Sequence, residues 1–464
     1  MFSRILHDKP KEECGVFGIY APGIDVDAAQ LTYYGLYALQ HRGQDSAGIA
    51  VSNSQSINVH KGLGLVAQVF NENNLKQLKG SMAVGHVRYS TTGASSLENA
   101  QPVISRFSDK TLCLAHNGNL TNTNELRQHL AKNKVFFQTT SDSEIILQLI
   151  SQNSTLSLTE AVKMTMHQIK GAYSLVIMTE NQLIGARDPK GMRPLCFGTL
   201  GEGYVLASES CALDAVGAQF SRDVKPGEII TIDQAGIKST QFPLSSQRSL
   251  CIFEYIYLAR VDSVIDGESV NQVRRNLGKA LAQEYFIHAD MVIPVPDSGI
   301  TSALGYTEES GLPYKEGLTK NRYAGRTFIQ PGQELRELGV KLKFNPIKDI
   351  LKGQGIVMVD DSLVRGTTCR QIVKMLRQAG VMEVHLLVAS PPILCPCYYG
   401  IDIASPDQLV AARFNQEEIR RFIGADSLHY LSLNGLFSAL KAPREEFCSA
   451  CFNGTYPTEM ARSI

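Results

Sequence analysis

The first half of the chain alternates short apolar runs with polar turns, a pattern that predicts strands with interspersed helices. The runs SLVIMT and LIGARD flank a polar turn at residues 180–182, and this arrangement is typical of a β-hairpin. A helix is predicted to begin at Ser141, because Ser141 and Glu144 have the spacing of a capping box. We therefore expect an α+β organisation in this half.

The second half has a different pattern. Residues 233–248 are polar and rich in turn-forming residues, so we place a domain boundary near residue 245. The runs MVIPVP and GIVMVDD then have the composition of buried strands, and each precedes a loop with Ser or Thr and Gly. The second loop leads into a helical stretch that ends near Gly380. This alternation predicts a parallel α/β sheet.

Composition narrows the class of protein. The 464 residues suffice for two or three domains, and 44% of them are apolar, as in a soluble globular protein. The 45 basic and 45 acidic side chains give a net charge of zero, which argues against a nucleic-acid or membrane-surface binder. No apolar run is as long as a membrane span.

The ten cysteines indicate chemistry rather than disulfide bonding. The first thirteen residues are charged and do not have the pattern of a secretory signal, so we expect a reducing, cytoplasmic compartment. In such a compartment, thiols more often serve catalysis or metal binding.

The stretch GIVMVDDSLVRGTT has the features of a phosphate-binding loop. Asp360 and Asp361 end a predicted strand, and residues 362–368 lead into a predicted helix. Amide groups at a helix start bind phosphate, hydroxyl groups of Thr367 and Thr368 add donors, and paired carboxylates suit ribose hydroxyls or hydrated Mg²⁺. The loop is not a Walker loop. A solvated strand-to-helix turn is the alternative, and the two preceding acids argue against it.

The same stretch resembles the phosphoribosylpyrophosphate (PRPP) signature of type I phosphoribosyltransferases. The resemblance implies that Asp360 and Asp361 hold ribose and one Mg²⁺ per subunit. It further implies that the PRPP loop supplies Ser362, Arg365, Gly366, Thr367 and Thr368 to the 5′-phosphate.

Two further motifs extend this resemblance. VIPVPDSG resembles the pyrophosphate loop of these enzymes and implies that Asp297 and Ser298 lie near the metal. KNRYAGRTF resembles their basic lid, which implies that Lys320, Arg322 and Arg326 close over pyrophosphate and exclude water. A solvated loop is the alternative, and it is the more common role of such a basic stretch on its own.

Four motifs in the first half resemble glutaminases with an N-terminal nucleophile: QHRGQDSAG (40–48), GHVRYSTTG (85–93), AHNGNLTN (115–122) and TTSDSE (139–144). Together with the PRPP signature they resemble the glutamine PRPP amidotransferases over nearly the whole chain. This resemblance implies an αββα glutaminase domain, residues 14–245, and a type I phosphoribosyltransferase domain with a C-terminal cluster-binding tail, residues 246–464.

The resemblance also assigns Cys14 as the nucleophile. In these enzymes the cysteine is the first residue of the mature chain, so that its α-amine, with an ordinary pKa of about 7.7–8.0, can accept the proton. Residues 1–13 are therefore expected to be a propeptide. The alternative, a buried structural cysteine, is the usual role of an isolated Cys.

Other glutaminase roles follow by motif. Arg88 is expected to bind the α-carboxylate of glutamine, and Asp142 its α-ammonium, unless Asp142 only caps its helix. Asn117 and Gly118 are expected to form the oxyanion hole. Three histidines, His41, His86 and His116, lie in separate motifs without the spacing of metal ligands, so we expect positioning or packing roles.

The remaining cysteines suggest a metal centre. Cys448 and Cys451 form a CxxC pair that alone fits zinc, redox or cluster chemistry. Resemblance to the iron–sulfur branch of the family nominates Cys251, Cys397, Cys448 and Cys451 as ligands of one [4Fe–4S] cluster per subunit. Zinc on the same four ligands is the alternative, and Cys395 is a rival for Cys397. Packing roles are expected for Cys113, Cys196, Cys211 and Cys369.

The resemblance thus implies an enzyme that converts PRPP, glutamine and water to 5-phosphoribosylamine, glutamate and pyrophosphate, the first committed step of purine synthesis. It implies a homo-oligomer, a dimer or tetramer, inhibited by purine nucleotides. Two rivals are an amidotransferase with another acceptor, which would need an isomerase or ATP-pyrophosphatase domain, and a non-enzymatic PRPP sensor with an oxygen-sensing cluster, which would not need the complete glutaminase set.

Overall fold

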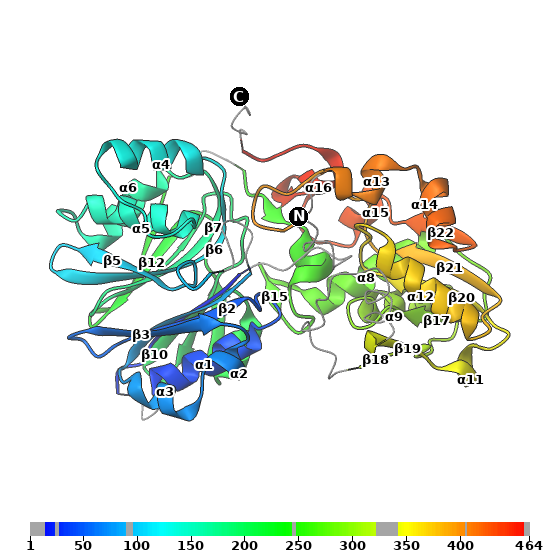
Figure 1. Cartoon of the computed structure of the whole chain (residues 1–464), viewed down its shortest axis with the longest axis horizontal. Coiled ribbons are helices and arrows are strands. Elements are labelled where there is room, and N and C mark those ends of the chain that lie inside the picture. The colour runs from blue at the N-terminus through cyan, green and yellow to red at the C-terminus, as the bar shows by residue number, and fades with distance from the viewer. Residues whose placement is uncertain are drawn as a thin grey trace.

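The structure, a computed structural model, describes residues 14–23, 27–89, 96–243, 247–321, 342–403 and 406–458. The predicted propeptide, Arg322 and Arg326 lie outside these ranges. Two halves are visible in Figure 1, with a two-sheet sandwich on the left and a three-layer α/β unit on the right. Segments around α16 (Ala450–Asn453) lie between them.

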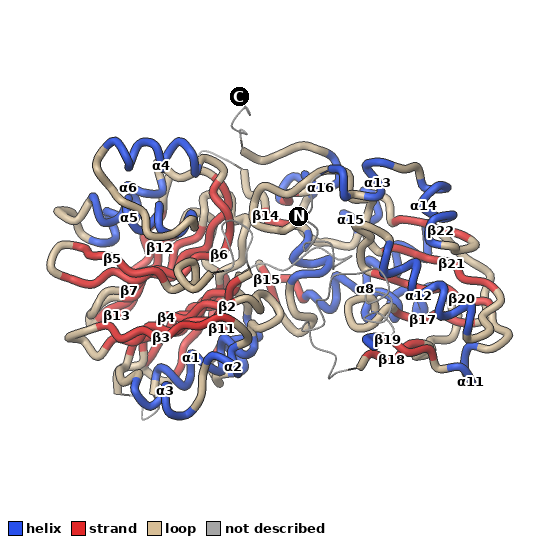
Figure 2. The backbone as a smooth tube through the Cα atoms, in the orientation of Figure 1, coloured by secondary structure: helices blue, strands red, loops and turns tan. Residues whose placement is uncertain are grey.

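Two antiparallel sheets stack in the first half (Figure 2). Val16 and Val84 of one sheet pack with Ala115 and Val176 of the other in a buried apolar layer, because alternate residues of each strand point inward. The first sheet has the order β11 (Gln219–Asp223), β9 (Cys196–Leu200), β10 (Gly203–Ala207), β1 (Gly15–Tyr20), β4 (Met82–Arg88), β2 (Ser46–Ser52), β3 (Ile57–Leu63). The second has the order β13 (Gly236–Gln241), β12 (Glu228–Asp233), β8 (Leu183–Arg187), β7 (Gly171–Met178), β6 (Lys110–Leu120), β5 (Val103–Phe107).

Helices cover both outer faces of this sandwich, which confirms the αββα expectation (Figure 1). The first sheet is covered by α1 (Ala28–Ala38), α2 (Val66–Val69), α3 (Glu72–Gln77) and α7 (Ser210–Ala215), and the second by α4 (Thr123–Lys132), α5 (Asp142–Gln152) and α6 (Leu158–Met166). The predicted hairpin is present, since β7 and β8 pair with Met178 opposite Leu183.

The predicted helix at Ser141 is also present, but its capping box is not. Ser141 caps α5 by accepting a hydrogen bond from the Ser143 N–H. The Glu144 carboxylate instead accepts from the N–H groups of Gln138 and Thr139, at 2.8 and 2.7 Å. The preceding turn therefore uses the acceptor that a capping box would require.

The second half contains the predicted parallel sheet, in the order β17 (Met291–Pro294), β20 (Gly355–Asp360), β21 (Glu383–Val388), β22 (Ser427–Tyr430). Val292 and Val357 face one apolar core, and Ile293 and Met358 face the other, so both faces are buried. The flanking helices are α8 (Val270–Glu284), α9 (Ile300–Ser310), α11 (Lys348–Leu351), α12 (Thr367–Gln378), α13 (Val410–Arg413), α14 (Gln416–Ile423) and α15 (Leu433–Ser438).

Short elements complete this half. A five-residue π-helix, η1, covers Glu254–Leu258, and two 3₁₀ turns are η2 (Pro406–Gln408) and η3 (Arg444–Glu446). The two-stranded sheets pair β14 (Leu250–Cys251) with β23 (Phe447–Cys448), β15 (Val264–Ile265) with β16 (Glu268–Ser269), and β18 (Leu318–Lys320) with β19 (Phe344–Pro346). In the described ranges, no helix has the length and apolar character that crossing a membrane requires.

Candidate active site

Cys14 lies immediately before β1, beside the last residue of β4. Gly15 is paired with Val87, so continuing this antiparallel register places Cys14 next to Arg88. Both residues are buried, and the Cys14 thiol donates to the carbonyl oxygen of Tyr89 across 3.6 Å. The fold thus brings the predicted nucleophile and the predicted carboxylate-binding arginine to one end of the first sheet.

The residues predicted to form the oxyanion hole lie on β6, in the facing sheet. A 3.0 Å contact between the Nε2 atom of His86 and the carbonyl oxygen of His116 ties β4 to β6 here. The neighbouring Asn117 is fully buried, and neither its side-chain oxygen nor its nitrogen has a hydrogen-bond partner within the described residues. A buried polar group in this state costs free energy. The amide is therefore available to a ligand.

Gly118 follows with a φ of +141°. A Cβ at this position would lie 2.1 Å from the carbonyl oxygen of Ala172 on β7, so only glycine fits. The required glycine and the unpaired amide are adjacent, as an oxyanion hole built from one side chain and one backbone N–H requires.

Asp142 is the first residue of α5 and closes the other side of this site. Its Oδ2 accepts from the Leu120 N–H at 3.0 Å, and its Oδ1 is 3.6 Å from Nδ1 of His116. Burial by itself would raise the pKa of Asp142, but His116 and the hydrogen bonds outweigh burial and lower it. An ionised, buried carboxylate suits an ammonium ligand.

The contacts of the three motif histidines are compatible with the positioning or packing roles expected of them. His41 contacts Glu209 at 2.7 Å, Nε2 of His86 contacts the carbonyl oxygen of His116, and Nδ1 of His116 lies 3.2 Å from the Ser143 hydroxyl. Burial lowers the pKa of His86 to about 3, so its imidazole is neutral. In the described part of the chain, no group of three or more His, Cys, Asp or Glu side chains is placed to hold a single metal ion, and this includes the four cysteines described below, which line a cavity.

The second site lies at the carboxyl end of β20. Asp360 and Asp361 are buried, and the Ser362 hydroxyl donates to Oδ1 of Asp361 at 2.6 Å. Gly366, with a φ of +77°, turns the chain into α12, whose first residue is Thr367. Left-handed backbone of this kind favours glycine, and the turn leaves the helix amides facing the loop.

Cys369 has a contact that the sequence did not indicate. Its thiol lies 3.5 Å from Oδ2 of Asp360 and is a donor to that carboxylate. The packing role expected for Cys369 is therefore incomplete, because the thiol also orients an acid of the candidate site. The other three core cysteines, Cys113, Cys196 and Cys211, are buried as expected.

The pyrophosphate-loop motif lies beside this acid pair. The Val295 N–H donates to the carbonyl of Val359 at 2.8 Å, which holds the loop containing Asp297 and Ser298 against β20. Lys320 forms an ion pair with Asp297, so one lid residue reaches the loop. Arg365 donates to the side chain of Gln408 at 2.5 Å.

The four cysteines nominated for a cluster come together from three segments. Cys251 and Cys448 are opposite each other in the parallel pair β14–β23. A small cavity is lined by Cys251, Cys397, Cys448 and Cys451 together with apolar side chains, and Cys395 is not among its lining residues. Burial, together with the smaller effect of the nearby Cys397, raises the pKa of Cys448 to about 12.

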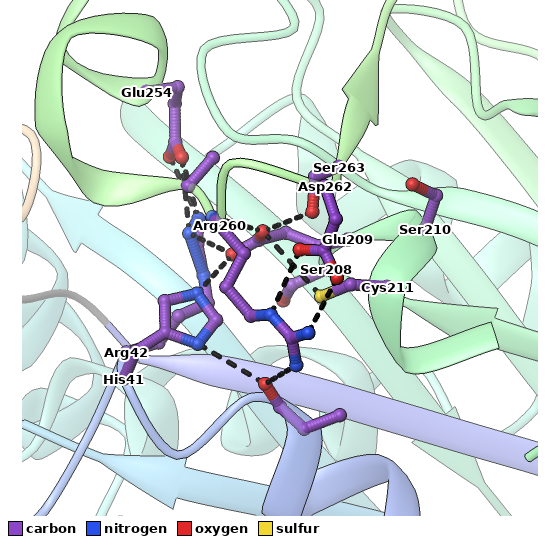
Figure 3. A network of polar contacts seen from close by, with 12 residues as sticks. His41, Arg42, Ser208, Glu209, Ser210, Cys211, Glu254, Arg260, Asp262 and Ser263 are labelled. Atoms are coloured by element: carbon purple, nitrogen blue, oxygen red, sulfur yellow. Dashed lines mark hydrogen bonds and ion pairs between the residues drawn. The ribbon is translucent and has the colours of Figure 1, made fainter. Parts of the chain in front are cut away.

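A network of buried charges joins the two halves (Figure 3). Arg42, from the QHRGQDSAG motif, donates three hydrogen bonds to Glu254 of η1, at 2.8, 2.9 and 3.1 Å. Glu209 lies 3.2 Å from Arg42 and accepts from the Ser263 hydroxyl at 2.6 Å. No role for Arg42 was predicted from the sequence, because its partner Glu254 is more than 200 positions away and no local signal identifies it.

These two sites define a glutamine amidotransferase joined to a phosphoribosyltransferase. Residues 86–215 match the family described as "Glutamine amidotransferase domain", and residues 262–390 match "Phosphoribosyl transferase domain". The chain is 49% identical to the amidophosphoribosyltransferase of Bacillus subtilis, over 97% of this chain and 95% of that protein. It is 52% identical to that of Synechocystis, over 98% and 93%.

A solved structure is similar throughout. The glutamine PRPP amidotransferase from B. subtilis, complexed with ADP and GMP, superposes with a TM-score of 0.91 at 48% identity, covering 97% of this chain and 98% of that one. The chain therefore belongs to the amidophosphoribosyltransferase family. It is an enzyme of the first step of purine biosynthesis, and its substrates are glutamine and PRPP.

Proposed function

We propose that Cys14 is the glutaminase nucleophile and that Asn117 and Gly118 form its oxyanion hole. The observation that carries this proposal is the buried Asn117 amide, which has no partner in the described residues although it lies beside a required glycine. Both atoms of such a group would be satisfied by a substrate rather than by the fold. Arg88 and Asp142 bind the α-carboxylate and α-ammonium of glutamine.

In this assignment the Cys14 sulfur attacks the side-chain carbonyl carbon of glutamine. The carbonyl oxygen becomes an oxyanion that accepts from the Asn117 amide and the Gly118 N–H. The C–N bond then breaks, the nitrogen leaves as ammonia after taking a proton, and a glutamyl thioester remains. Water hydrolyses the thioester to glutamate and restores the thiol.

The proton acceptor is assigned to the α-amine of Cys14, so the active chain begins at this residue. The proposal includes cleavage after Glu13, within a segment that lies outside the described residues. The domain division at residue 245 is part of the same proposal, and it is supported by the change from β13, in the sandwich, to β14, which pairs near the C-terminus.

The ammonia attacks C1 of PRPP, and pyrophosphate leaves from the same carbon. We assign the 5′-phosphate to the loop of Ser362, Arg365, Gly366, Thr367 and Thr368, and pyrophosphate to Lys320 with Arg322 and Arg326 of the lid. Asp360, Asp361 and Ser298 are the oxygen ligands that fit Mg²⁺. When bound, Mg²⁺ neutralises charge on the leaving pyrophosphate.

We assign a [4Fe–4S] cluster to Cys251, Cys397, Cys448 and Cys451. Each thiolate of such a cluster binds a different iron atom, so the four sulfurs surround a space rather than converge on one point. The cavity lined by these four thiols supports this arrangement over a single zinc ion. The cluster is proposed as a structural group.

Three further properties are proposed. The B. subtilis structure was determined with ADP and GMP, so purine nucleotides are candidate feedback inhibitors of this chain. We further propose a homo-oligomer, dimer or tetramer, and a cytoplasmic location.

The experiment for the nucleophile is Cys14→Ala. Glutamine-dependent formation of 5-phosphoribosylamine is expected to fall to background, while ammonia-dependent formation continues because the PRPP site is separate. N-terminal sequencing of the active wild-type enzyme is expected to read Cys14 first. Loss of both activities in a folded variant, or an active chain that begins at Met1 or Phe2, would overturn the assignment.

A further inference from the structure

The strand that carries the candidate oxyanion group is contacted by a segment from the other half of the molecule. The Asn119 side-chain amide donates to the carbonyl oxygen of Tyr398 at 2.9 Å. Tyr398 immediately follows the candidate cluster ligand Cys397 and lies 279 positions from Asn119 in the chain. The transferase half therefore makes a direct polar contact one residue beyond Gly118.

The backbone of Gly400 also approaches the same strand. An added Cβ on Gly400 would lie 3.2 Å from the carbonyl carbon of Gly118 and 3.4 Å from its Cα and oxygen. Gly400 also has a φ of +119°, where only glycine is relaxed. The backbones of two glycines from different halves thus lie so close that an added Cβ would force one of them to move, and one of these glycines supplies a candidate N–H of the oxyanion hole.

Between these contacts, the carbonyl of Tyr399 is held by Arg193. The buried guanidinium donates to this oxygen through Nη2 at 2.6 Å and Nε at 3.2 Å, and its Nη1 lies 3.4 Å from Glu254. The backbone carbonyl of Arg193 in turn accepts from the Ser174 hydroxyl at 3.2 Å. Ser174 is the β7 residue opposite Asn117, so this chain of hydrogen bonds ends beside β6, the strand that carries Asn117 and Gly118.

Apolar packing supports the same geometry. The Tyr399 ring packs with Ala172, the β7 residue opposite Asn119, and with Met192 in a small buried cluster. Hydrogen bonds, close backbone packing and apolar burial therefore hold the segment 398–400 against the end of β6.

We propose that Gly400 and the carbonyls of Tyr398 and Tyr399 position the end of β6 that carries the oxyanion-hole residues of the glutaminase. Gly400 is a positioning residue, since it acts on glutamine only through Gly118. The transferase half then completes a site whose reacting groups all belong to the glutaminase half. This inference rests on the proposed role of Asn117 and Gly118.

The test is Gly400→Ala. The added methyl group must push on the Gly118 backbone, so kcat for glutamine hydrolysis is expected to fall between about tenfold and about 100-fold. KM for glutamine is expected to stay within about twofold, because Arg88 and Asp142 bind the α-groups elsewhere. Ammonia-dependent synthesis is expected to be unchanged. This split between kcat and KM is not the signature of general destabilisation.

Gly236→Ala is the matched control. Gly236 has a φ of +102°, and an added Cβ there meets nothing within 4 Å, so the substitution introduces backbone strain without a new contact. It is expected to leave glutaminase kinetics unchanged. If Gly400→Ala does not fold, Asn119→Ala removes the Tyr398 contact with little change of shape, and a lowered kcat at constant KM is again expected.

Asn117→Ala, measured alongside, separates the two levels of inference. If Asn117→Ala impairs hydrolysis and both Gly400→Ala and Asn119→Ala do not, the positioning role is wrong and the oxyanion assignment stands. If Asn117→Ala itself has no effect, the assignment on which the inference rests is wrong. Equal loss of glutamine- and ammonia-dependent activity in Gly400→Ala would also overturn the positioning role.

Discussion

The Asn117 side chain is held in a fully buried position by its strand, and the described residues offer it no hydrogen bond. Its neighbours already have partners: His116 contacts Ser143, and Asp142 accepts from the Leu120 N–H. The fold thus orients these neighbours through those contacts, although Nε2 of His116 also has no partner among the described residues, and it leaves both polar atoms of the Asn117 amide for the reaction. Free energy spent on an unsatisfied group is recovered when a developing oxyanion accepts its hydrogen bond.

Replacing Asn117 by alanine tests this role. We expect kcat for glutamine hydrolysis to fall by about 10² to 10³, the usual effect of removing one oxyanion donor. Thermal stability should hold or rise slightly, because the substitution removes an unsatisfied buried amide. Steady-state glutaminase assays and a melting curve measure both. A large loss of stability with unchanged kcat would show that the amide has a structural partner.

The two acids at the carboxyl end of β20 differ in their surroundings, although they are adjacent in the sequence. Asp360 is approached by the Cys369 thiol and accepts from the Asp361 N–H at 2.9 Å, whereas Asp361 accepts from the Ser362 hydroxyl. Each carboxylate is thus oriented by a neighbouring donor from the loop or from α12. Such orientation reduces the reorganisation needed to bind ribose and metal.

Asp360→Asn and Asp361→Asn should each raise KM for PRPP and lower the synthesis rate by at least about tenfold, because ribose and metal recognition require the charge. Basal glutamine hydrolysis should change far less. The control is Asp349→Asn, an exposed acid of the same half. Kinetics with varied PRPP provide the measurement, and wild-type values in both loop variants would leave the loop with a structural role only.

The elements of both halves were predictable where a local pattern determines them. The β7–β8 hairpin, the α5 helix, the strands β17 and β20, and α12 all follow from apolar runs and turn residues. The capping box was predicted but is absent, because Glu144 accepts hydrogen bonds from the preceding turn rather than from the start of the helix. The identities of Ser141 and Glu144 alone do not reveal which N–H groups donate to the Glu144 carboxylate.

Candidate site residues were predictable by motif, but the contacts between them were not. Gly400 and Tyr398 approach Gly118 and Asn119 from a distant part of the chain. The amino-acid sequence around Gly400 does not indicate its approach to Gly118. Long-range packing of this kind follows from how two folded halves meet, which no single-sequence pattern specifies.

The β14–β23 pair shows how short elements can depend on chemistry at their ends. Two residues on each strand make a sheet too small to be stable alone, and its register sets Cys251 opposite Cys448. Cys395 and Leu394 both donate their N–H groups to the carbonyl of Cys451, which ties the third segment to the CxxC pair. A bound cluster would fasten all three segments, since metal ligation couples to folding.

The cysteine assignment predicts different outcomes for two neighbouring residues. Cys397→Ser should lose iron and sulfide or fail to fold, whereas Cys395→Ser should retain both, because Cys397 lines the cavity and Cys395 does not. Iron and sulfide analysis of purified protein provides the measurement. Iron retained in Cys397→Ser but lost in Cys395→Ser would reverse the choice, and wild-type protein with zinc but neither iron nor sulfide would refute the cluster.

The two halves are joined through buried charges as well as through apolar packing. Arg42, Arg193 and Glu254 form one connected group, and Arg187 pairs with Asp266 at 2.8 Å in another. Removing one partner of a buried pair typically costs about 3–5 kcal/mol, because the other charge stays buried. The relative placement of the two active sites therefore depends on a few side chains that must keep their charge.

Glu209 makes this dependence sensitive to pH. Burial alone would raise its pKa, but His41, Arg42 and the Ser263 hydroxyl outweigh burial and hold the pKa well below its ordinary value. A carboxylate whose pKa is lower in the folded state contributes stability above its unfolded pKa, about 4.3, and loses it as pH falls further. The interface should therefore weaken below about pH 4.3.

The test compares melting temperatures at pH 7 and at successively lower pH for the wild type and Glu209→Gln. The variant should melt at a lower temperature than the wild type at pH 7, because a neutral amide cannot replace the charge beside Arg42. Its further decline between pH 5 and pH 3, values chosen to span the unfolded pKa of about 4.3, should be smaller than that of the wild type. Glu72→Gln, at a side chain that is 88% exposed, should follow the wild type throughout. Parallel acid profiles for wild type and Glu209→Gln would show that other carboxylates govern the acid response of the molecule.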